Sequence, residues 1–244
     1  MDYHTRKEFK ILYAIVTILG ILNVALVLIW TFQYLGGFAW QNDPLHQFNY
    51  HPLLAVLGMV VLYGNGLLMY RILYFKAKLT LKFFHAITMF ITFVLAVISV
   101  KCAFDSHDFR TPPIPNLYSL HSWIGLGTII LFSFQFFLGF ISFLYPGAKA
   151  MHRRIYLHYH QFFGVIIFIL AIISCHSGIM EKVKASLGKE YSDLPPAGYV
   201  ANFLGVSLTV FAILVLYLIN TPQFKRRPLP EEDKITLELH DPLP

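Results

Sequence analysis

The chain has 244 residues, of which 57% are hydrophobic and 13% are charged, and its formal net charge is +6 at pH 7. Soluble domains carry about 25% charged residues, so this composition excludes an ordinary water-soluble domain. The Lys and Arg residues lie mainly between apolar runs, so we interpret the positive charge as a signal of topology and not as evidence of nucleic-acid binding.

Six apolar runs follow one another along the chain, each long enough to cross a bilayer core of about 30 Å, which takes about 20 helical residues. Backbone groups in lipid must be hydrogen-bonded internally, so each run predicts an α-helix, and the fold class is all-α integral membrane protein. The runs cover residues 11–32, 51–70, 83–104, 120–145, 157–180 and 199–220. We therefore predict a six-helix membrane domain over residues 11–222, with a cytosolic N-terminal segment (1–10) and a cytosolic C-terminal tail (223–244).

The positive charges predict the direction of each span. The first run follows Arg6, Lys7 and Lys10, as a signal-peptide core would, but it is too long for one and no cleavage site follows, so we expect a retained helix. Fourteen of the 19 Lys and Arg residues lie before the first span, after the second and fourth spans, or after the sixth. Cytosolic loops carry the excess of Lys and Arg, so both termini are predicted to be cytosolic.

One histidine lies near an end of each of the four consecutive spans from the second to the fifth: His51, His85, His121 and His160. A coordinating side chain inside a membrane span is costly and reads as functional. Imidazole is a common metal ligand and an axial ligand of haem iron. Because successive spans alternate in direction, His51 pairs in depth with His121 near the outer face, and His85 pairs with His160 near the cytosolic face. The pattern predicts two metal or haem centres at opposite faces.

Any one of the four histidines could by itself be a helix-end residue that is hydrogen-bonded to a neighbour. Other histidines fit the paired pattern less well. His158 is two residues from His160, which is about 200° around a helix, and His176 is sixteen residues away, which is about 160°. Both are expected to face elsewhere, with His176 hydrogen-bonded to a neighbouring helix. His107 is expected in an outer loop, and the two cysteines, Cys102 and Cys175, are expected to be free thiols.

Several motifs resemble the cytochrome b561 family. They are F-N-Y-H-P-L around His51, G-N-G-L-L-M-Y-R ending at Arg71, K-F-F-H-A around His85, L-Y-S-L-H-S-W around His121, and H-Q-F-F-G beginning at His160. The resemblance covers roughly residues 36–228 and favours His160 over His158. It implies a central four-helix bundle that holds two b haems, each iron bound by one histidine pair.

The resemblance also implies roles for individual positions. Arg71 would contact the inner haem, and the outer haem would contact Asn116, Leu117, Tyr118, Ser119 and Glu181. Cytosolic ascorbate would be bound by Lys78, Lys82 and Arg153, which suits its charge because ascorbate is a monoanion at neutral pH. His107 would take part in binding the outer substrate. The alternative interpretation of the basic residues is cytosolic charge that only fixes topology.

These features predict an ascorbate-dependent transmembrane oxidoreductase, a monodehydroascorbate or ferric reductase. Electrons would pass from cytosolic ascorbate through two b haems to monodehydroascorbate or a ferric chelate on the other side, in a homodimer. The loop T-P-P-I-P after Arg110 is more proline-rich than the family pattern, which leaves the outer substrate open. The sequence also does not decide whether the protein lies in the membrane of secretory vesicles, in that of lysosomes or endosomes, or in the plasma membrane.

The alternative function is a histidine-lined metal-ion or proton transporter without haem. A transporter of this kind needs polar residues through the middle of the membrane. The spans offer mainly Ser, Thr, Asn65 and Gln135 there, and no carboxylate.

Overall fold

The computed structural model describes residues 3–229, and all regular structure in that range is helical. Six helical segments are long and apolar enough to cross a membrane, which confirms the predicted fold class. Their bounds are α1 Tyr3–Tyr34, the composite second span Pro44–Ile72, α5 Lys78–Asp108, α6 Leu120–Phe143, α7 Ala150–Leu187 and α8 Pro196–Asn220. Short 3₁₀ turns follow the last two helices at Gly188–Asp193 and Pro222–Phe224. Residues 230–244 of the predicted C-terminal tail lie outside the described residues.

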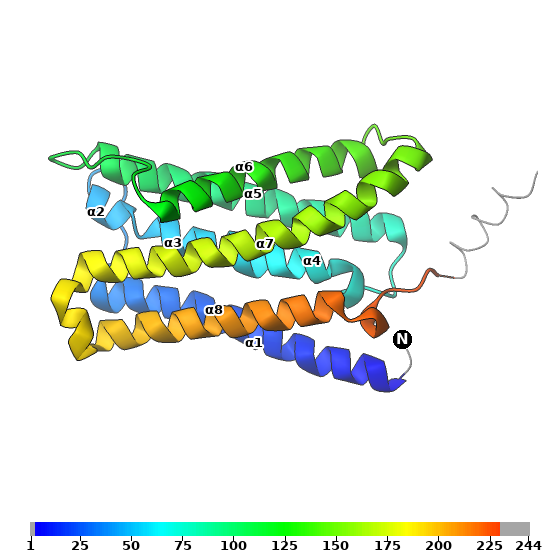
Figure 1. Ribbon diagram of the computed structural model, residues 1–244, viewed down its shortest axis with the longest axis horizontal. Coiled ribbons are helices and arrows are strands. Elements are labelled where there is room, and N and C mark those ends of the chain that lie inside the picture. The colour runs from blue at the N-terminus through cyan, green and yellow to red at the C-terminus, as the bar shows by residue number, and fades with distance from the viewer. Residues whose placement is uncertain (1–2, 230–244) are drawn as a thin grey trace, which may run out of the picture.

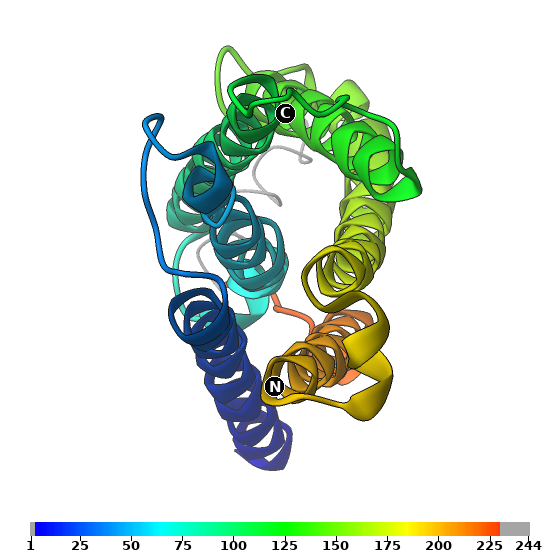
Figure 2. The same ribbon diagram turned by 90° about the vertical axis from the view of Figure 1, so that its left-hand side faces the viewer.

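The helices run lengthwise in alternating directions, as Figure 1 shows. The start of α1 and the end of α8 lie at one end of the bundle, together with the α4–α5 and α6–α7 connections. The opposite end carries the segment before α3, the α5–α6 loop and the α7–α8 connection. Viewed along the bundle, α1 and α8 lie side by side at one edge, and α6 lies beside α7 (Figure 2). The end that holds the start of α1 and the end of α8 is therefore the end where the described part of the chain concentrates Lys and Arg.

The helices extend beyond the apolar runs from which they were predicted. The predicted N-terminal segment is largely the first turns of α1, and α7 continues well past its apolar run at both ends. The third span was predicted to end at residue 104, but α5 continues to Asp108. Its added turn is stabilised by Asp105, which pairs with Lys101 at 2.5 Å and accepts a 3.0 Å hydrogen bond from the Gln47 amide.

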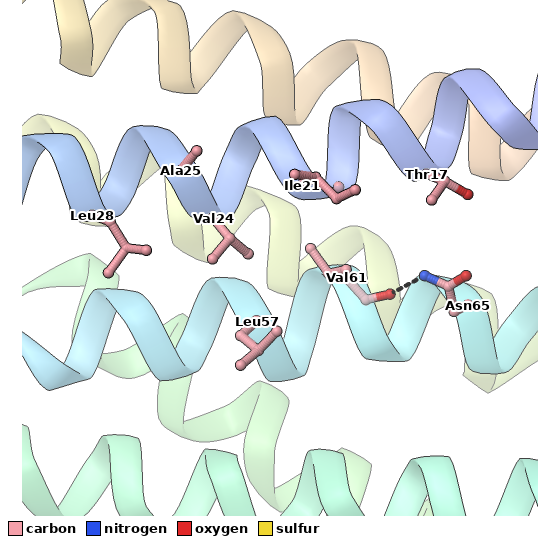
Figure 3. Close-up of a pocket in the computed structure, with 9 residues that line it drawn as sticks. Thr17, Ile21, Val24, Ala25, Leu28, Leu57, Val61 and Asn65 are labelled. Carbon is pink, nitrogen blue, oxygen red and sulfur yellow. Dashed lines mark hydrogen bonds between the residues drawn. The ribbon is translucent and has the colours of Figure 1, made fainter.

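The second span departs from a continuous α-helix. A short helix α2 (Pro44–Gln47) precedes α3 (Tyr50–Ala55), which continues into a π-helix η1 (Val56–Leu62) and then into α4 (Tyr63–Ile72). Leu57 of η1 and Val61 face α1 across an apolar groove of about 400 Å³ that contains Asn65 at one end (Figure 3). The Asn65 amide donates to the Val61 carbonyl at 2.8 Å, and its oxygen accepts from the Tyr13 hydroxyl at 2.8 Å.

An aromatic cluster fills the middle of the bundle. Tyr63, Phe132 and Phe168 are almost fully buried, and the Tyr63 ring lies 5.1 Å and 6.0 Å from the other two ring centroids. The Tyr63 hydroxyl donates to the Gly164 carbonyl at 2.9 Å. These residues come from spans two, four and five, between the levels of the two histidine pairs. The interior between the pairs is therefore packed with apolar rings.

Candidate functional site

The structure brings the four histidines together in two pairs. The rings of His51 and His121 have centroids 5.9 Å apart and planes inclined at 79°. The rings of His85 and His160 have centroids 6.1 Å apart and planes inclined at 72°. Two imidazoles bonded to opposite sides of one metal at about 2 Å have centroids about 6 Å apart. Each pair therefore has the spacing that a single iron between two rings requires.

The second ring nitrogen of three histidines is fixed by a backbone carbonyl. The Nδ1–H of His51 donates to Ser99 at 3.1 Å, that of His85 to Gly66 at 2.9 Å, and that of His121 to Ser174 at 2.9 Å. This hydrogen bond sets the tautomer and leaves Nε2 free to coordinate, as metal-ligating histidines usually do. The Nδ1 of His160 is buried without a hydrogen-bond partner among the described residues.

Two glycines leave space for the histidine rings. A Cβ atom at Gly178 would lie 2.7 Å from Cε1 of His121, and one at Gly139 would lie 2.9 Å from Cε1 of His160. Both distances are shorter than any ordinary van der Waals contact. Gly139 on α6 and Gly178 on α7 thus each permit a histidine ring position that an alanine would block.

A cavity of about 660 Å³ surrounds the outer pair. Its volume lies in the range of about 300–1,000 Å³ that is typical of cofactor and ligand sites. The lining includes His51 and His121 and every residue predicted for the outer side: His107, Asn116, Leu117, Tyr118, Ser119 and Glu181. Ser119 also caps α6, where its hydroxyl oxygen accepts from the backbone N–H of Ser122 at 3.2 Å and so fixes the turn that contains His121.

Tyr118 and Glu181 meet at the rim of this cavity. The Tyr118 hydroxyl donates to a Glu181 carboxylate oxygen at 3.4 Å. Partial desolvation, followed by the neighbouring Glu181 charge, raises the pKa of Tyr118. The contact joins the end of the α5–α6 loop to α7, so two predicted site residues that are far apart in the sequence lie together.

The expected loop position of His107 is wrong. His107 lies in the last turn of α5, and its ring is parallel to that of Phe48, with 3° between the planes and 6.5 Å between the centroids. Helix formation past the apolar run places it beside the cavity. Phe48 lies three residues before His51 and was not identified from the sequence, although that spacing was a signal that the two rings share a face.

The predicted ascorbate residues gather near the inner pair. The Lys82 ammonium donates to the Phe143 carbonyl at 2.9 Å, and the Phe143 ring lies 5.3 Å from the ring of His160. The charges of Arg153 and Lys78 act on Lys82, so cations from α5 and α7 lie close together. Lys78, Lys82 and Arg153 therefore form a cluster of positive charge at the same end of the bundle as the inner pair.

Arg71 has a structural partner at the same end of the bundle. Its guanidinium donates to the Thr221 carbonyl at 2.8 Å and to the Ile219 carbonyl. Cationic donors at these positions cap the last carbonyls of α8 and favour its C-terminal dipole. The Arg71 side chain therefore links α4 to the end of α8.

His176, His158 and the two cysteines lie as expected. His176 faces α8, where its Nε2 contacts the Gly205 carbonyl at 3.0 Å and the Thr209 hydroxyl at 2.9 Å. His158 is exposed, and Cys102 and Cys175 are free. Within residues 3–229, no three His, Cys, Asp or Glu side chains are grouped to hold a metal ion. Pairs of histidines suit an iron whose other ligands come from a macrocycle better than a bare ion, which takes about four protein ligands.

Comparison with known sequences identifies the family. The family model described as eukaryotic cytochrome b561 matches residues 50–186, which contain all four histidines. This chain belongs to the cytochrome b561 family. The cytochrome b561 match starts just before His51 and ends past Gly178 and Glu181, so it spans both histidine pairs and the outer cavity.

Curated relatives extend the similarity over nearly the whole chain. The lysosomal membrane ascorbate-dependent ferrireductase CYB561A3 of Danio rerio is 41% identical over 234 residues, covering 93% of this cytochrome b561 and 93% of the relative. The transmembrane ascorbate-dependent reductase CYB561 of Homo sapiens is 38% identical over 221 residues, covering 91% and 86%. A putative transmembrane ascorbate-dependent reductase CYB561 homolog of Caenorhabditis elegans is 37% identical over 235 residues, covering 93% and 88%.

Proposed function

We propose that this cytochrome b561 carries electrons from cytosolic ascorbate, through two b haems, to monodehydroascorbate or a ferric chelate on the opposite side of the membrane. The observation that carries the proposal is the presence of two histidine pairs with ring centroids 5.9 Å and 6.1 Å apart at opposite ends of the bundle. The protein is an ascorbate-dependent oxidoreductase, in keeping with the relatives of that name.

The residues present fit the haem that the family implies. His51 and His121 would bind the outer iron, and His85 and His160 the inner one, with the glycines at 139 and 178 leaving room for the rings. When bound, haem supplies an iron that cycles between ferric and ferrous states. An iron held by one of these histidine pairs would serve electron transfer and not oxygen binding, because both histidines would be its ligands.

The lining residues would complete each site. Around the outer haem these are Asn116, Leu117, Tyr118, Ser119 and Glu181, all of which line the cavity. Arg71 would approach the inner haem from the last turn of α4, beside the end of α8. The protein would hold each macrocycle in an apolar bundle and tune it through the hydrogen bonds at Nδ1 of His51, His85 and His121.

Ascorbate would bind at the inner end to Lys78, Lys82 and Arg153. Ascorbate is a monoanion, so the three cations attract and orient it. It loses one electron and one proton to become monodehydroascorbate, and the proton goes to cytosolic water. On the opposite side a ferric chelate gains one electron, or monodehydroascorbate gains one electron and one proton from water. The excess of Lys and Arg at the inner end supports the cytosolic assignment of that end.

The transporter alternative has less support. An ion or proton path needs polar groups or water through the centre of the bundle. The space between the two histidine pairs is instead occupied by the rings of Tyr63, Phe132 and Phe168. Apolar packing there suits an electron carrier, since electrons need no water-filled path.

Haem stoichiometry and reduction test the proposal. Purified protein is expected to hold two b haems per chain, both reduced by ascorbate. His85→Ala and His160→Ala are each expected to lose one haem, whereas His158→Ala, at an exposed position two residues away, is expected to keep both. Haem content is measured against protein concentration by absorption of the reduced pyridine complex. Protein without haem, or equal losses in His158→Ala and His160→Ala, would contradict the proposal.

A further inference from the structure

A layer of side chains lies one helical turn outside the outer histidine pair, and it centres on Phe48. The Phe48 ring contacts the His51 ring at 5.6 Å between centroids and is parallel to that of His107. The Lys182 ammonium lies over the same ring, 4.7 Å from its centroid, which is a cation–π contact. Residues from the α2–α3 turn, α5 and α7 therefore converge on one ring that itself contacts a proposed iron ligand.

Two cations without an ion-pair partner among the described residues lie in this layer. Lys182 and Arg110 both line the outer cavity, and their positive charges act on each other. In the described part of the chain, neither has a carboxylate within ion-pair distance. Two like charges beside one cavity repel each other. An anion bound between them would offset this repulsion, so the arrangement favours an anionic ligand.

An unpaired ring nitrogen supports the same conclusion. The Nδ1 atom of His107 is buried and has no hydrogen-bond partner among residues 3–229, although the side chain lines the cavity. A buried polar atom without a partner is unfavourable, typically by about 1–3 kcal/mol. The His107 ring lines the same cavity as the two cations, so an anion held there would lie beside this ring.

We propose that Lys182 and Arg110 form a docking site for an anionic electron acceptor at the mouth of the outer cavity, with His107 beside it and Phe48 between it and His51. The proposal rests on the proposed function, since the acceptor must receive its electron from the outer haem. Both candidate acceptors, monodehydroascorbate and a ferric carboxylate chelate, are anions. Because the Phe48 ring contacts the His51 ring, one aromatic ring would separate the docked anion from His51.

Lys182→Met tests the site, and Lys184→Met is its matched control. Lys184 is on the same helix, exposed, about 200° around from Lys182, and outside the cavity lining. Ascorbate-reduced protein in lipid nanodiscs is mixed rapidly with ferric citrate, an anion, or with hexaammineruthenium(III), a cation. Lys182→Met is expected to slow oxidation by ferric citrate about tenfold and to leave oxidation by the cation unchanged or faster. The difference should shrink at 1 M salt, where the Debye length is about 3 Å.

Equilibrium binding gives a readout that does not depend on electron transfer. Gallium(III) citrate, which ascorbate does not reduce, is titrated into the haem-loaded protein by calorimetry. Lys182→Met is expected to weaken its binding about tenfold relative to the wild type and to Lys184→Met. Any anion bound at the cytosolic cations contributes equally to all three proteins and cancels in the comparison.

Three outcomes would overturn the docking site. One is equal slowing with both acceptors, and another is an equal effect of Lys184→Met. The third is a loss or potential shift of the outer haem in Lys182→Met with unchanged gallium citrate affinity, because Lys182 would then contact the haem and not the acceptor. Failure of ascorbate to reduce the wild-type haems would instead overturn the proposed function itself.

Discussion

At the residue scale, each proposed iron ligand depends on a neighbour that has no charge and no reactive group. The carbonyls of Ser99, Gly66 and Ser174 orient three imidazoles, and the missing side chains of Gly139 and Gly178 give two rings their space. A histidine in a membrane helix has several rotamers, so the ligand position is set by these contacts as much as by the histidine.

Gly178→Ala is therefore expected to disturb only the outer site. The new Cβ would lie 2.7 Å from His121 Cε1, so the ring must move, and we expect the protein to lose the outer haem and keep the inner one. Alanine improves helix propensity by about 1 kcal/mol, so the fold should survive. Gly127→Ala is the control, because a Cβ there meets nothing within 4 Å. The number of haems per chain checks the result. An unchanged number in Gly178→Ala would show that this glycine does not set the position of the His121 ring.

Lys82→Met is expected to weaken ascorbate binding without loss of haem. The Lys82 ammonium is held near the inner pair by its hydrogen bond to the Phe143 carbonyl. Its removal would leave two of the three cations proposed to bind the ascorbate anion. We expect about a tenfold rise in the KM for ascorbate, which corresponds to about 1.4 kcal/mol. Lys76→Met, an exposed cation on the same side, should change the KM little. Stopped-flow haem reduction measures both, and equal effects would indicate a role in topology only.

At the element scale, the second span must satisfy two sets of contacts at once. Its start carries His51 opposite His121, and its later part carries Tyr63, bonded to Gly164, and Gly66, whose carbonyl accepts from His85. The π-helix η1 lies between the two. One extra residue in a π-turn changes the phase of everything before it relative to everything after it, and such turns often occur at functional sites.

Deletion of Leu57 tests the purpose of the π-helix. Loss of one residue should let η1 become α-helical and rotate the preceding segment by about 100°, which turns His51 away from His121. We expect loss of the outer haem with retention of the inner one. Leu57→Ala keeps the residue count and removes only the side chain that faces the groove beside α1, so it should keep both haems (Figure 3). If the deletion also kept both, the π-helix would not set the position of His51.

The sequence predicts some of these elements and not others, for physical reasons. Apolar length identifies the six spans, and alternation of direction suffices to pair the histidines by depth. The sequence did not predict that α5 continues to His107. The last turn of α5 is stabilised by a hydrogen bond from Gln47 to Asp105, and these residues are 58 positions apart in the sequence. The π-helix has the same apolar composition as an α-helix. Contact between Phe48 and Lys182 joins different spans, which periodicity cannot reveal.

At the scale of the whole molecule, the two histidine pairs lie at opposite ends of a bundle whose centre is filled by Tyr63, Phe132 and Phe168. The cations predicted for ascorbate lie near the starts of α5 and α7, at the end of the bundle where α1 begins, and the Phe48 layer lies at the opposite end, just before α3 (Figure 1). An electron that moves between the pairs would cross much of the low-dielectric core without a compensating ion. Its distribution should therefore respond to the membrane potential.

Sealed vesicles in which the protein has one orientation test this arrangement. Orientation is read from labelling of Lys184 and Lys189 by an impermeant amine reagent, since both lysines are exposed at the proposed outer end. Where they react from outside, trapped ascorbate should reduce the haems, and external ferric citrate should oxidise them again. A potassium diffusion potential of about 60 mV, negative inside, is worth at most about 1.4 kcal/mol per electron. It should raise the ratio of reduced outer haem to reduced inner haem by up to about tenfold, measured by absorption spectra. A shift of the opposite sign would reverse the proposed direction, and no shift would mean that both haems lie at one depth.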